Sequence, residues 1–393
     1  MKKYLMTIVK LFRPLYTIYY WVGTLLLGLI KYIVKPENNL ILFISFGGKK
    51  FDDSPRIIYE AMINDERFNG YELVWAFHNP NDFKIPRGRK IKTDSFKYYI
   101  TALKARCWIT NSRVERGLKF KGKNTFYFNT WHGTPIKKMG KDITVENKSF
   151  NSKDKWNVDI MTSQSKYEAD IFSRVFNIER ERFLLCGLPR NDSLANSTEE
   201  SKLAMRKKIG LPLEKKVILY APTFREYERD NKYNVVLAPP IDFDKWKKVI
   251  GDDHVVLFRA HYEVAKVLNI EPGDGFIFNV SDYPVLNDLM IASDMLISDY
   301  SSIYFDYSIL DRPMLCYAYD YEEYVEKRGL YFDIRDVLLG GSITEDELLN
   351  LIRDIPYIKD VDLVTSFRSN YVQNYGNATG ISLDTIYKNI EKN

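Results

Sequence analysis

Two doubly wound α/β domains that face each other across a central cleft are the fold that this sequence predicts. The chain has 393 residues, more than a single small domain contains. From residue 40 onward, short apolar runs alternate with polar, helix-periodic stretches, a pattern typical of parallel sheets covered by helices on both faces. A polar stretch at 187–215 interrupts this pattern, which then starts again.

The composition is that of a folded globular protein. Hydrophobic residues make up 45% of the chain and charged residues 28%, which excludes a disordered chain, a collagen-like fibre and a many-pass membrane protein. The three cysteines are far apart and form no CxxC pair, so we expect folding in a reducing compartment.

The basic charge is concentrated at the N-terminus. Residues 1–36 hold six Lys or Arg residues and no acidic residue, whereas the whole chain has a net charge of +5. The remainder is therefore close to neutral, and nucleic-acid binding is not expected.

Within this basic segment, residues 14–30 are uncharged and rich in Tyr and Trp. As a helix they span about 25 Å, less than the roughly 30 Å of a bilayer's hydrocarbon core. Their aromatic side chains suit the headgroup boundary. We therefore favour a membrane-associating interfacial helix, with a true span and a helix packed on its own protein as alternatives.

Each predicted element follows from its local pattern. In the first half, continuous apolar runs predict buried strands, and the stretches 55–65 and 95–105 predict helices. The strands are expected at 40–46, 71–77, 107–110, 125–131 and 158–163.

The second half repeats the alternation, with helices predicted at 301–310 and 383–393. Its strands are expected at 217–222, 255–260, 276–280, 295–298 and 314–319. We thus divide the chain into a membrane-associating segment (1–36), an N-terminal domain (37–200) and a C-terminal domain (201–393). The last helix is a candidate to pack back on the N-terminal domain.

Chemically active side chains follow several of the predicted strands. In open parallel sheets, ligands bind beyond the carboxyl ends of the strands, so we expect these residues to share one site. They are Gly47, Gly48, Lys49, Asp52, His132, Gly133, Thr134, Thr223, Arg225, Arg259, His261, Asp299, Ser301 and Ser302.

His132 is the candidate general base. It follows a predicted strand and precedes Gly133, Thr134 and Pro135, a sharp turn that would expose its side chain at the sheet edge. A histidine pKa of about 6.5 suits proton abstraction at neutral pH. A purely structural histidine is the alternative.

Two further groups are candidates for binding phosphate. Arg259 and His261 are two residues apart in an extended strand, so they would point to the same side and address one anion. Ser301 and Ser302 precede a predicted helix, where serines bind phosphate together with the helix amides or simply cap the helix. Asp299 would orient a hydroxyl group or cap the predicted helix.

The other candidates have simpler patterns. Thr223 and Arg225 add hydrogen-bond donors at another strand end. The Gly-rich loop at 47–50, beside Asp52, matches neither a Walker A nor a GxGxxG motif, and a solvated loop is the alternative. The sequence has no HxxxH, HExxH or Cys/His cluster, so no tight zinc site is expected.

Four motifs together resemble the CDP-glycerol glycerophosphotransferase family, whose members synthesise wall teichoic acid in Gram-positive bacteria. They are NTWHGTPIKKMG (129–140), YAPTFRE (220–226), FRAHY (258–262) and SDYSSIYFDYSILDRPMLCYAYD (298–320). GLPRND (187–192) and FGGKKFDDSPRIIYE (46–60) also fit, and the resemblance runs from about residue 40 to about residue 375.

The resemblance implies a GT-B-like fold with an acceptor-binding N-terminal domain and a CDP-alditol-binding C-terminal domain. It implies transfer of glycerol phosphate from CDP-glycerol to a hydroxyl of a polyprenyl-diphosphate-linked teichoic acid precursor, with release of CMP. The family's polymerases carry extra helical repeats that this sequence lacks, which favours a primase or a limited-extension step.

The resemblance also implies roles for the candidate residues. His132 and His261 match the family's two motif histidines and are the expected catalytic residues. The expected ligands of the donor diphosphate are Arg259, Ser301, Ser302, Thr223, Arg225 and Asp299. The expected acceptor-binding residues are Gly47, Gly48, Lys49, Asp52, Gly133 and Thr134.

We accordingly expect CDP-glycerol, the lipid-linked acceptor and membrane lipid as partners, with other teichoic acid enzymes as further candidates. The expected location is the cytoplasmic face of the cell membrane, with peripheral or monotopic attachment. No cofactor is required, although a divalent cation near the diphosphate is compatible with the sequence. A CDP-ribitol donor, a GT-B glycosyltransferase using a nucleotide sugar and a non-catalytic scaffold remain alternatives.

Overall fold

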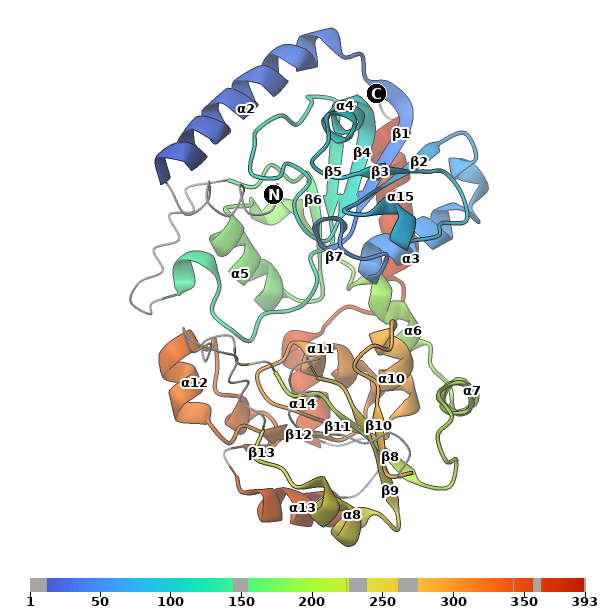
Figure 1. Cartoon of the computed structure of the whole chain (residues 1–393), viewed down its shortest axis with the longest axis vertical. Coiled ribbons are helices and arrows are strands. Elements are labelled where there is room, and N and C mark those ends of the chain that lie inside the picture. Colours follow the sequence, from blue (N-terminus) through green and yellow to red (C-terminus); the bar gives the residue numbers. More distant parts are fainter. Residues whose placement is uncertain are drawn as a thin grey trace.

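Two α/β domains, each built on a parallel sheet, make up the protein, which confirms the predicted fold class (Figure 1). The computed structural model describes residues 13–143, 155–223, 225, 239–260, 275–341, 343–355 and 362–391. The N-terminal domain lies above the C-terminal domain in Figure 1, and helix α2 (Arg13–Ile33) crosses the outer side of the N-terminal domain.

The N-terminal domain contains a seven-stranded parallel sheet with the order β3-β2-β1-β4-β5-β6-β7. Its strands are β1 (Glu37–Ile44), β2 (Glu72–Phe77), β3 (Arg89–Lys92), β4 (Ala105–Thr110), β5 (Phe126–Asn129), β6 (Ile160–Ser163) and β7 (Phe183–Leu185). Successive side chains of a strand point to opposite faces. Along β1, Ile41 and Phe43 therefore enter one core, and Leu40, Leu42 and Ile44 enter the other.

Helices cover both faces of this sheet. On the Ile41 face lie α3 (Asp53–Met62) and the C-terminal helix α15 (Ala378–Glu391). On the opposite face lie α4 (Phe96–Lys104) and α5 (Lys166–Phe176). Each helix of the second pair begins at a serine, Ser95 or Ser165, whose hydroxyl accepts a hydrogen bond from a backbone amide in the first turn.

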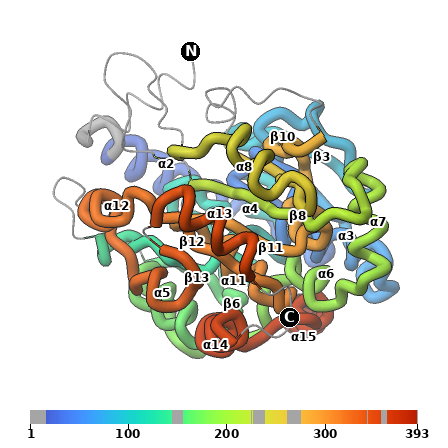
Figure 2. Tube along the Cα trace, turned by 90° about the horizontal axis from the view of Figure 1, so that it is seen from below, coloured from blue at the N-terminus to red at the C-terminus, as the bar shows by residue number. Residues whose placement is uncertain are grey.

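The C-terminal domain contains a six-stranded parallel sheet with the order β10-β9-β8-β11-β12-β13. Its strands are β8 (Lys216–Tyr220), β9 (His254–Phe258), β10 (Ile277–Asn279), β11 (Met295–Ser298), β12 (Met314–Tyr317) and β13 (Leu339–Gly341). Helices α8 (Phe243–Ile250) and α13 (Glu345–Asp354) cover the lower face, toward the viewer in Figure 2. The other face is covered by α10 (Leu286–Ala292), α11 (Ile303–Tyr307) and α14 (Asp362–Tyr371). Helix α12 (Tyr321–Arg328) follows β12.

The chain crosses between the domains twice, and the two crossings touch. The first contains the 3-10 turn η6 (Pro189–Asn191), α6 (Asp192–Ala195) and α7 (Glu199–Ile209), so the polar stretch at 187–215 is largely helical. Gly187 has a φ of 92°, and a Cβ there would lie 2.6 Å from the carbonyl oxygen of Asn374 in the returning crossing. Only glycine fits this close approach.

Helix α15 ties the end of the chain to the first domain. Its Leu383, Ile386 and Ile390 are buried against the N-terminal sheet. The buried Arg106 of β4 donates to the carbonyl oxygen of Ile390 at 2.9 Å, which satisfies a carbonyl at the end of the helix. The carboxylate of Asp192 accepts from the amides that begin α15.

Three strands were not predicted from the sequence, and five strands (β1, β5, β8, β9 and β12) end two residues before their predicted ends. β3, β7 and β13 are short strands, and β13 contains two glycines, so they lack the long apolar run that marks a buried strand. β5 ends at Asn129, two residues before the predicted end. Trp131, with a φ of 49°, already belongs to a turn.

Helix α2 contacts the N-terminal domain along one side only. Leu27 is buried there, and the Lys31 ammonium donates to the carbonyl oxygen of Lys121 at 3.1 Å. The large hydrophobic residues left exposed on α2 are Ile18, Trp21, Val22, Leu25, Leu26, Leu29, Tyr32 and Ile33. No helix among the described residues is long and apolar enough to cross a bilayer.

The docking of α15 generates a stability prediction. Replacing Ile386, which is fully buried, with alanine should lower the free energy of unfolding by about 2–5 kcal/mol because it opens a cavity against the sheet. Chemical denaturation of the full chain measures the change. Ile381 lies on the same helix but is 38% exposed. Ile381→Ala is the matched control and should change stability by only about 0.5 kcal/mol. Equal losses in both variants would contradict the described packing.

Candidate active site

The strand ends of the two sheets meet at a shared pocket of about 390 Å³. The N-terminal domain contributes the turn after β5, which includes His132 and Gly133. The C-terminal domain contributes Thr223, after β8, and Ser301 and Ser302, after β11. The pocket therefore collects residues of both domains at the carboxyl ends of parallel strands, where such sheets bind ligands.

His132 is held in one tautomer by the backbone. Its Nδ1 lies 2.7 Å from the carbonyl oxygen of Asn111, which can only accept a hydrogen bond, so Nδ1 carries the proton. Nε2 is then the unprotonated nitrogen. Burial lowers the pKa of His132 below its usual value, which keeps the ring neutral at pH 7. A neutral imidazole with a bare Nε2 is equipped to accept a proton.

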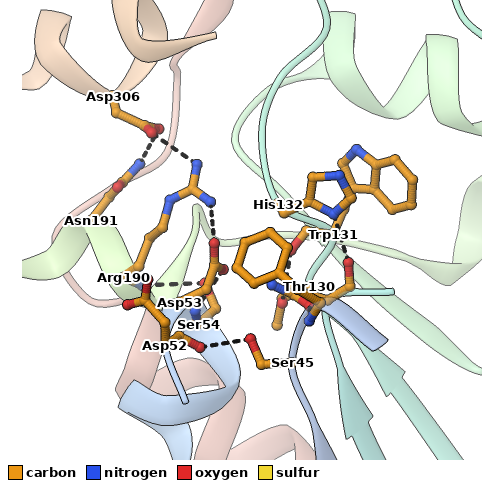
Figure 3. Close-up of polar contacts among 12 residues, drawn as sticks. Ser45, Asp52, Asp53, Ser54, Thr130, Trp131, His132, Arg190, Asn191 and Asp306 are labelled. Carbon is orange, nitrogen blue, oxygen red and sulfur yellow. Dashed lines mark hydrogen bonds and ion pairs between the residues drawn. The ribbon is translucent and has the colours of Figure 1, made fainter. Parts of the chain in front are cut away.

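Aromatic rings fix the plane of this imidazole (Figure 3). Trp131 stacks on it with ring centroids 4.1 Å apart, and the Phe46 ring lies 5.5 Å away. Phe46 belongs to the Gly-rich loop η1 (Phe46–Gly48), whose Phe46 amide donates to the Asn111 side-chain oxygen at 2.8 Å. This loop thus frames the histidine from the β1 side.

The histidine turn approaches the serine pair closely. A Cβ at Gly133, which has a φ of 151°, would lie 2.9 Å from the Ser302 hydroxyl oxygen. Ser302 is the N-cap of α11 but makes no side-chain capping hydrogen bond, whereas the Ser301 hydroxyl accepts from the Ile303 amide at 3.3 Å. The Ser302 hydroxyl is therefore not used for capping the helix.

Two predicted diphosphate ligands, Arg225 and Asp299, have partners within the protein. Arg225 is 3% exposed. Its guanidinium binds Asp299 at 2.8 Å and Asp320 at 2.6 Å, and the Tyr300 ring lies beneath it at 4.9 Å. Asp299 also accepts from the Thr223 amide. This buried cluster contacts Thr223 and Tyr300, which line the pocket. Direct contact of Arg225 and Asp299 with the donor stays a prediction.

Arg259 follows β9, and one of its guanidinium nitrogens donates to the carbonyl oxygen of Tyr283 at 2.7 Å. Burial lowers the pKa of Arg259, and the charge of Asp52 opposes that shift across the domain boundary. Lys49 is exposed at the surface. His261 lies outside the described residues.

Thr134 lines the pocket and is held by buried hydrogen bonds, and its predicted contact with the acceptor stays a prediction. It is fully buried, donates to the Glu168 carboxylate at 3.0 Å and accepts from the Gln164 side-chain amide at 2.9 Å. Burial raises the pKa of Glu168 to about 7. Glu168 also accepts from the Gln164 backbone amide, so it anchors the turn that carries His132.

Sequence reasoning did not single out two cations that line the pocket, Lys137 and Arg328. Lys137 was quoted only as part of a motif, and Arg328 ends α12, far from any strand end. No acidic residue is found among the described residues that line the pocket. Within the described part of the chain, no three His, Cys, Asp or Glu side chains gather to hold a metal ion.

Comparisons with known proteins agree on one family. The family model described as CDP-glycerol:poly(glycerophosphate) glycerophosphotransferase matches residues 27–391. A teichoic acid glycerol-phosphate transferase of Staphylococcus aureus is 34% identical over 341 residues, covering 81% of this chain and 85% of that protein. A teichoic acid poly(glycerol phosphate) polymerase of Staphylococcus epidermidis is 37% identical over 327 residues. The match covers 79% of this chain and 44% of that polymerase, so the chain spans less than half the length of this relative.

Among solved structures, the wall teichoic acid polymerase TagF has a similar fold. It superposes with a TM-score of 0.84 at 33% sequence identity, and the match covers 93% of both chains. This similarity supports the GT-B-like arrangement of the two domains that the sequence predicted.

The buried Glu168 generates a pH prediction. A carboxyl whose pKa rises from 4.5 to about 7 on folding stabilises the protein fully below pH 4.5. That contribution should be lost as the pH rises toward 7, by up to about 1.4 kcal/mol per pH unit. Urea denaturation between pH 4.5 and 7.5 measures it, and Glu168→Gln should remove this component of the pH dependence. An unchanged slope in the variant would assign the pH dependence to other groups.

Proposed function

The chain belongs to the CDP-glycerol:poly(glycerophosphate) glycerophosphotransferase family, and from this premise we propose that it transfers glycerol phosphate from CDP-glycerol to a teichoic acid precursor. The acceptor is a hydroxyl of a polyprenyl-diphosphate-linked chain, and CMP is released. The observation that carries the proposal is the neutral His132, whose bare Nε2 belongs to a pocket that Ser301 and Ser302 also line.

The reaction follows from this arrangement. The acceptor oxygen attacks the phosphorus that bears glycerol, and its proton passes to Nε2 of His132. A new P–O bond forms while the bond from this phosphorus to the bridging oxygen breaks. CMP leaves with the bridging oxygen and its electron pair. Positioning and electrostatics supply most of the rate in such transfers.

Cations and hydroxyls around the pocket suit the charge that develops on the departing phosphate. Lys137 and Arg328 give the pocket a positive lining, and Ser301 and Ser302 offer hydroxyl donors. We assign Arg259 and His261 to the donor diphosphate on the sequence resemblance. No metal is required by this scheme, and a divalent cation bound with the diphosphate is compatible with it.

We further propose that helix α2 binds the membrane surface in an interfacial position. Its outward side exposes Trp21, Leu25 and Leu29, with exposed fractions of 67%, 64% and 56%. Lys35 is exposed just beyond the end of the helix and suits anionic lipid. A peripheral attachment at the cytoplasmic face would bring the pocket to a lipid-linked acceptor and accounts for the exposed apolar side chains.

Loss of the general base tests the chemistry. His132→Ala should lower kcat for CMP release from CDP-glycerol by about 10²–10⁴-fold, the usual contribution of a general base. His78 is exposed, its Nδ1 lies 2.6 Å from the Thr93 hydroxyl oxygen, and it is absent from the pocket lining. His78→Ala is the matched control and should keep wild-type turnover. Wild-type turnover of His132→Ala would remove this residue from the mechanism.

Lipid binding tests the role of α2. The double variant Trp21→Glu, Leu25→Glu should bind phosphatidylglycerol-containing vesicles at least about tenfold more weakly, because each lost apolar side chain contributes over 1 kcal/mol. Co-sedimentation with vesicles measures the change. Val249, 43% exposed on the C-terminal domain, provides the control substitution Val249→Glu. Equal vesicle binding by the wild type, the double variant and Val249→Glu would contradict the proposal that α2 binds the membrane.

A further inference from the structure

Arg190 bridges the two domains behind the catalytic pocket (Figure 3). It belongs to η6, in the first crossing of the chain, and its side chain is 13% exposed. One guanidinium nitrogen binds the carboxylate of Asp53 at 2.7 Å, and the other binds Asp306 at 2.8 Å. Asp53 begins α3 of the N-terminal domain, and Asp306 lies in α11 of the C-terminal domain.

Both carboxylates belong to elements that carry the candidate active site. Asp306 follows Ser302 by four residues in α11, so it lies one helical turn beyond the pocket serine. Asp53 follows the loop of Phe46, whose ring contacts His132, and its charge favours the protonated form of that histidine. A Cβ built on Gly133 would lie 3.8 Å from the Arg190 guanidinium and 2.9 Å from the Ser302 hydroxyl. The guanidinium thus lies directly behind the contact between the histidine turn and the serine helix.

A second, neutral connection runs parallel to this ion pair. The Asn191 side-chain amide donates to Asp306 at 2.7 Å and to the side-chain oxygen of Gln164 at 3.0 Å. Gln164 donates to the hydroxyl of Thr134, two residues after His132. Arg190 and Asn191, which are adjacent in the first crossing, therefore bind the same aspartate, Asp306 of α11. Both residues also lead to the turn that carries His132: Arg190 lies next to Gly133, and Asn191 reaches Thr134 through Gln164.

The arrangement is difficult to explain by stability alone. A guanidinium and two carboxylates are removed from water, and such buried ion clusters add little stability relative to apolar residues of the same size. An arginine fork nevertheless fixes two carboxylates in one plane at defined distances, which a lysine ammonium does not. The cluster therefore fixes the distance and orientation of the two domains at this point.

We propose that Arg190 is a positioning residue for phosphoryl transfer, whose two ion pairs set the distance between His132 and the Ser302 end of α11. The assignment rests on the proposed function, because it names the reaction that this distance serves. Arg190 itself contacts neither substrate. Its loss should therefore impair the chemical step while leaving donor binding nearly intact.

Kinetics of Arg190→Lys test this role. The lysine keeps the positive charge but reaches one carboxylate at a time, so kcat should fall by about 100-fold, as expected for a misplacement of about 1 Å. KM for CDP-glycerol should stay near the wild-type value. Arg335 also binds a carboxylate through two nitrogens, that of Asp333, and is absent from the pocket lining. Arg335→Lys is the matched control and should keep wild-type kcat.

An activity-independent measurement separates this inference from the proposed function. Spin labels at Lys97→Cys and Asp252→Cys, exposed positions of the two domains, report the interdomain distance by pulsed electron resonance. The three native cysteines are buried, and burial raises their thiol pKa values, so they should resist labelling. Arg190→Lys should broaden or shift the distance distribution, and Arg335→Lys should not.

The outcomes are distinct. Wild-type protein that never releases CMP from CDP-glycerol, but shows the distance change in Arg190→Lys, would overturn the proposed function and keep Arg190 as the interdomain tie. Wild-type kcat together with an unchanged distance distribution in Arg190→Lys would overturn the inference. Should that variant not fold, Asp306→Asn takes its place: it removes one charge, leaves Arg190 paired with Asp53, and should show the same two effects.

Discussion

In the account we propose, the buried contact of Arg190 with Asp53 and Asp306 is the interaction on which the geometry of the candidate site depends. Each sheet has its own core and its own covering helices, and neither arrangement determines how the domains face each other. The guanidinium joins Asp53, the first residue of α3, to Asp306 of α11. Because three charges lose their hydration there, the contact is favourable only when both carboxylates are in place, which makes the interdomain geometry specific.

This geometry brings together side chains with complementary chemical properties. The N-terminal domain supplies a histidine that the Asn111 carbonyl orients and that burial keeps neutral. The C-terminal domain supplies two serines, and Arg225 pairs with Asp299 and Asp320 nearby. That internal pairing reduces the repulsion between these carboxylates and an anionic donor. Lys137 and Arg328 then leave the pocket with a positive lining. The result is a site suited to a phosphorylated ligand and to proton removal.

The sequence predicted much of this architecture because its signals are local. Continuous apolar runs marked most strands. Because ligands bind at the carboxyl ends of parallel strands, the sequence also predicted a shared site for His132, Thr223 and Ser302, and all three line the pocket. The burial of Arg225 escaped prediction because its partner Asp320 lies 95 residues away in the chain. The same holds for Arg190, 116 residues from Asp306. The sequence around Arg190 is polar, and this composition indicated a domain boundary. Only folding brings together the two carboxylates that bind Arg190, so no local pattern predicts the contact.

The most direct test of the central claim is the mass of the product made by the purified full-length protein. The reaction contains CDP-glycerol and a lipid-linked disaccharide that already bears one glycerol phosphate, and a parallel reaction contains CDP-ribitol. The account predicts CMP release and a gain of one or a few glycerol phosphate units on the lipid with the first donor. Turnover with CDP-ribitol alone would contradict the proposed donor. No CMP from either donor, with the acceptor unchanged, would contradict the proposed glycerophosphotransferase activity itself.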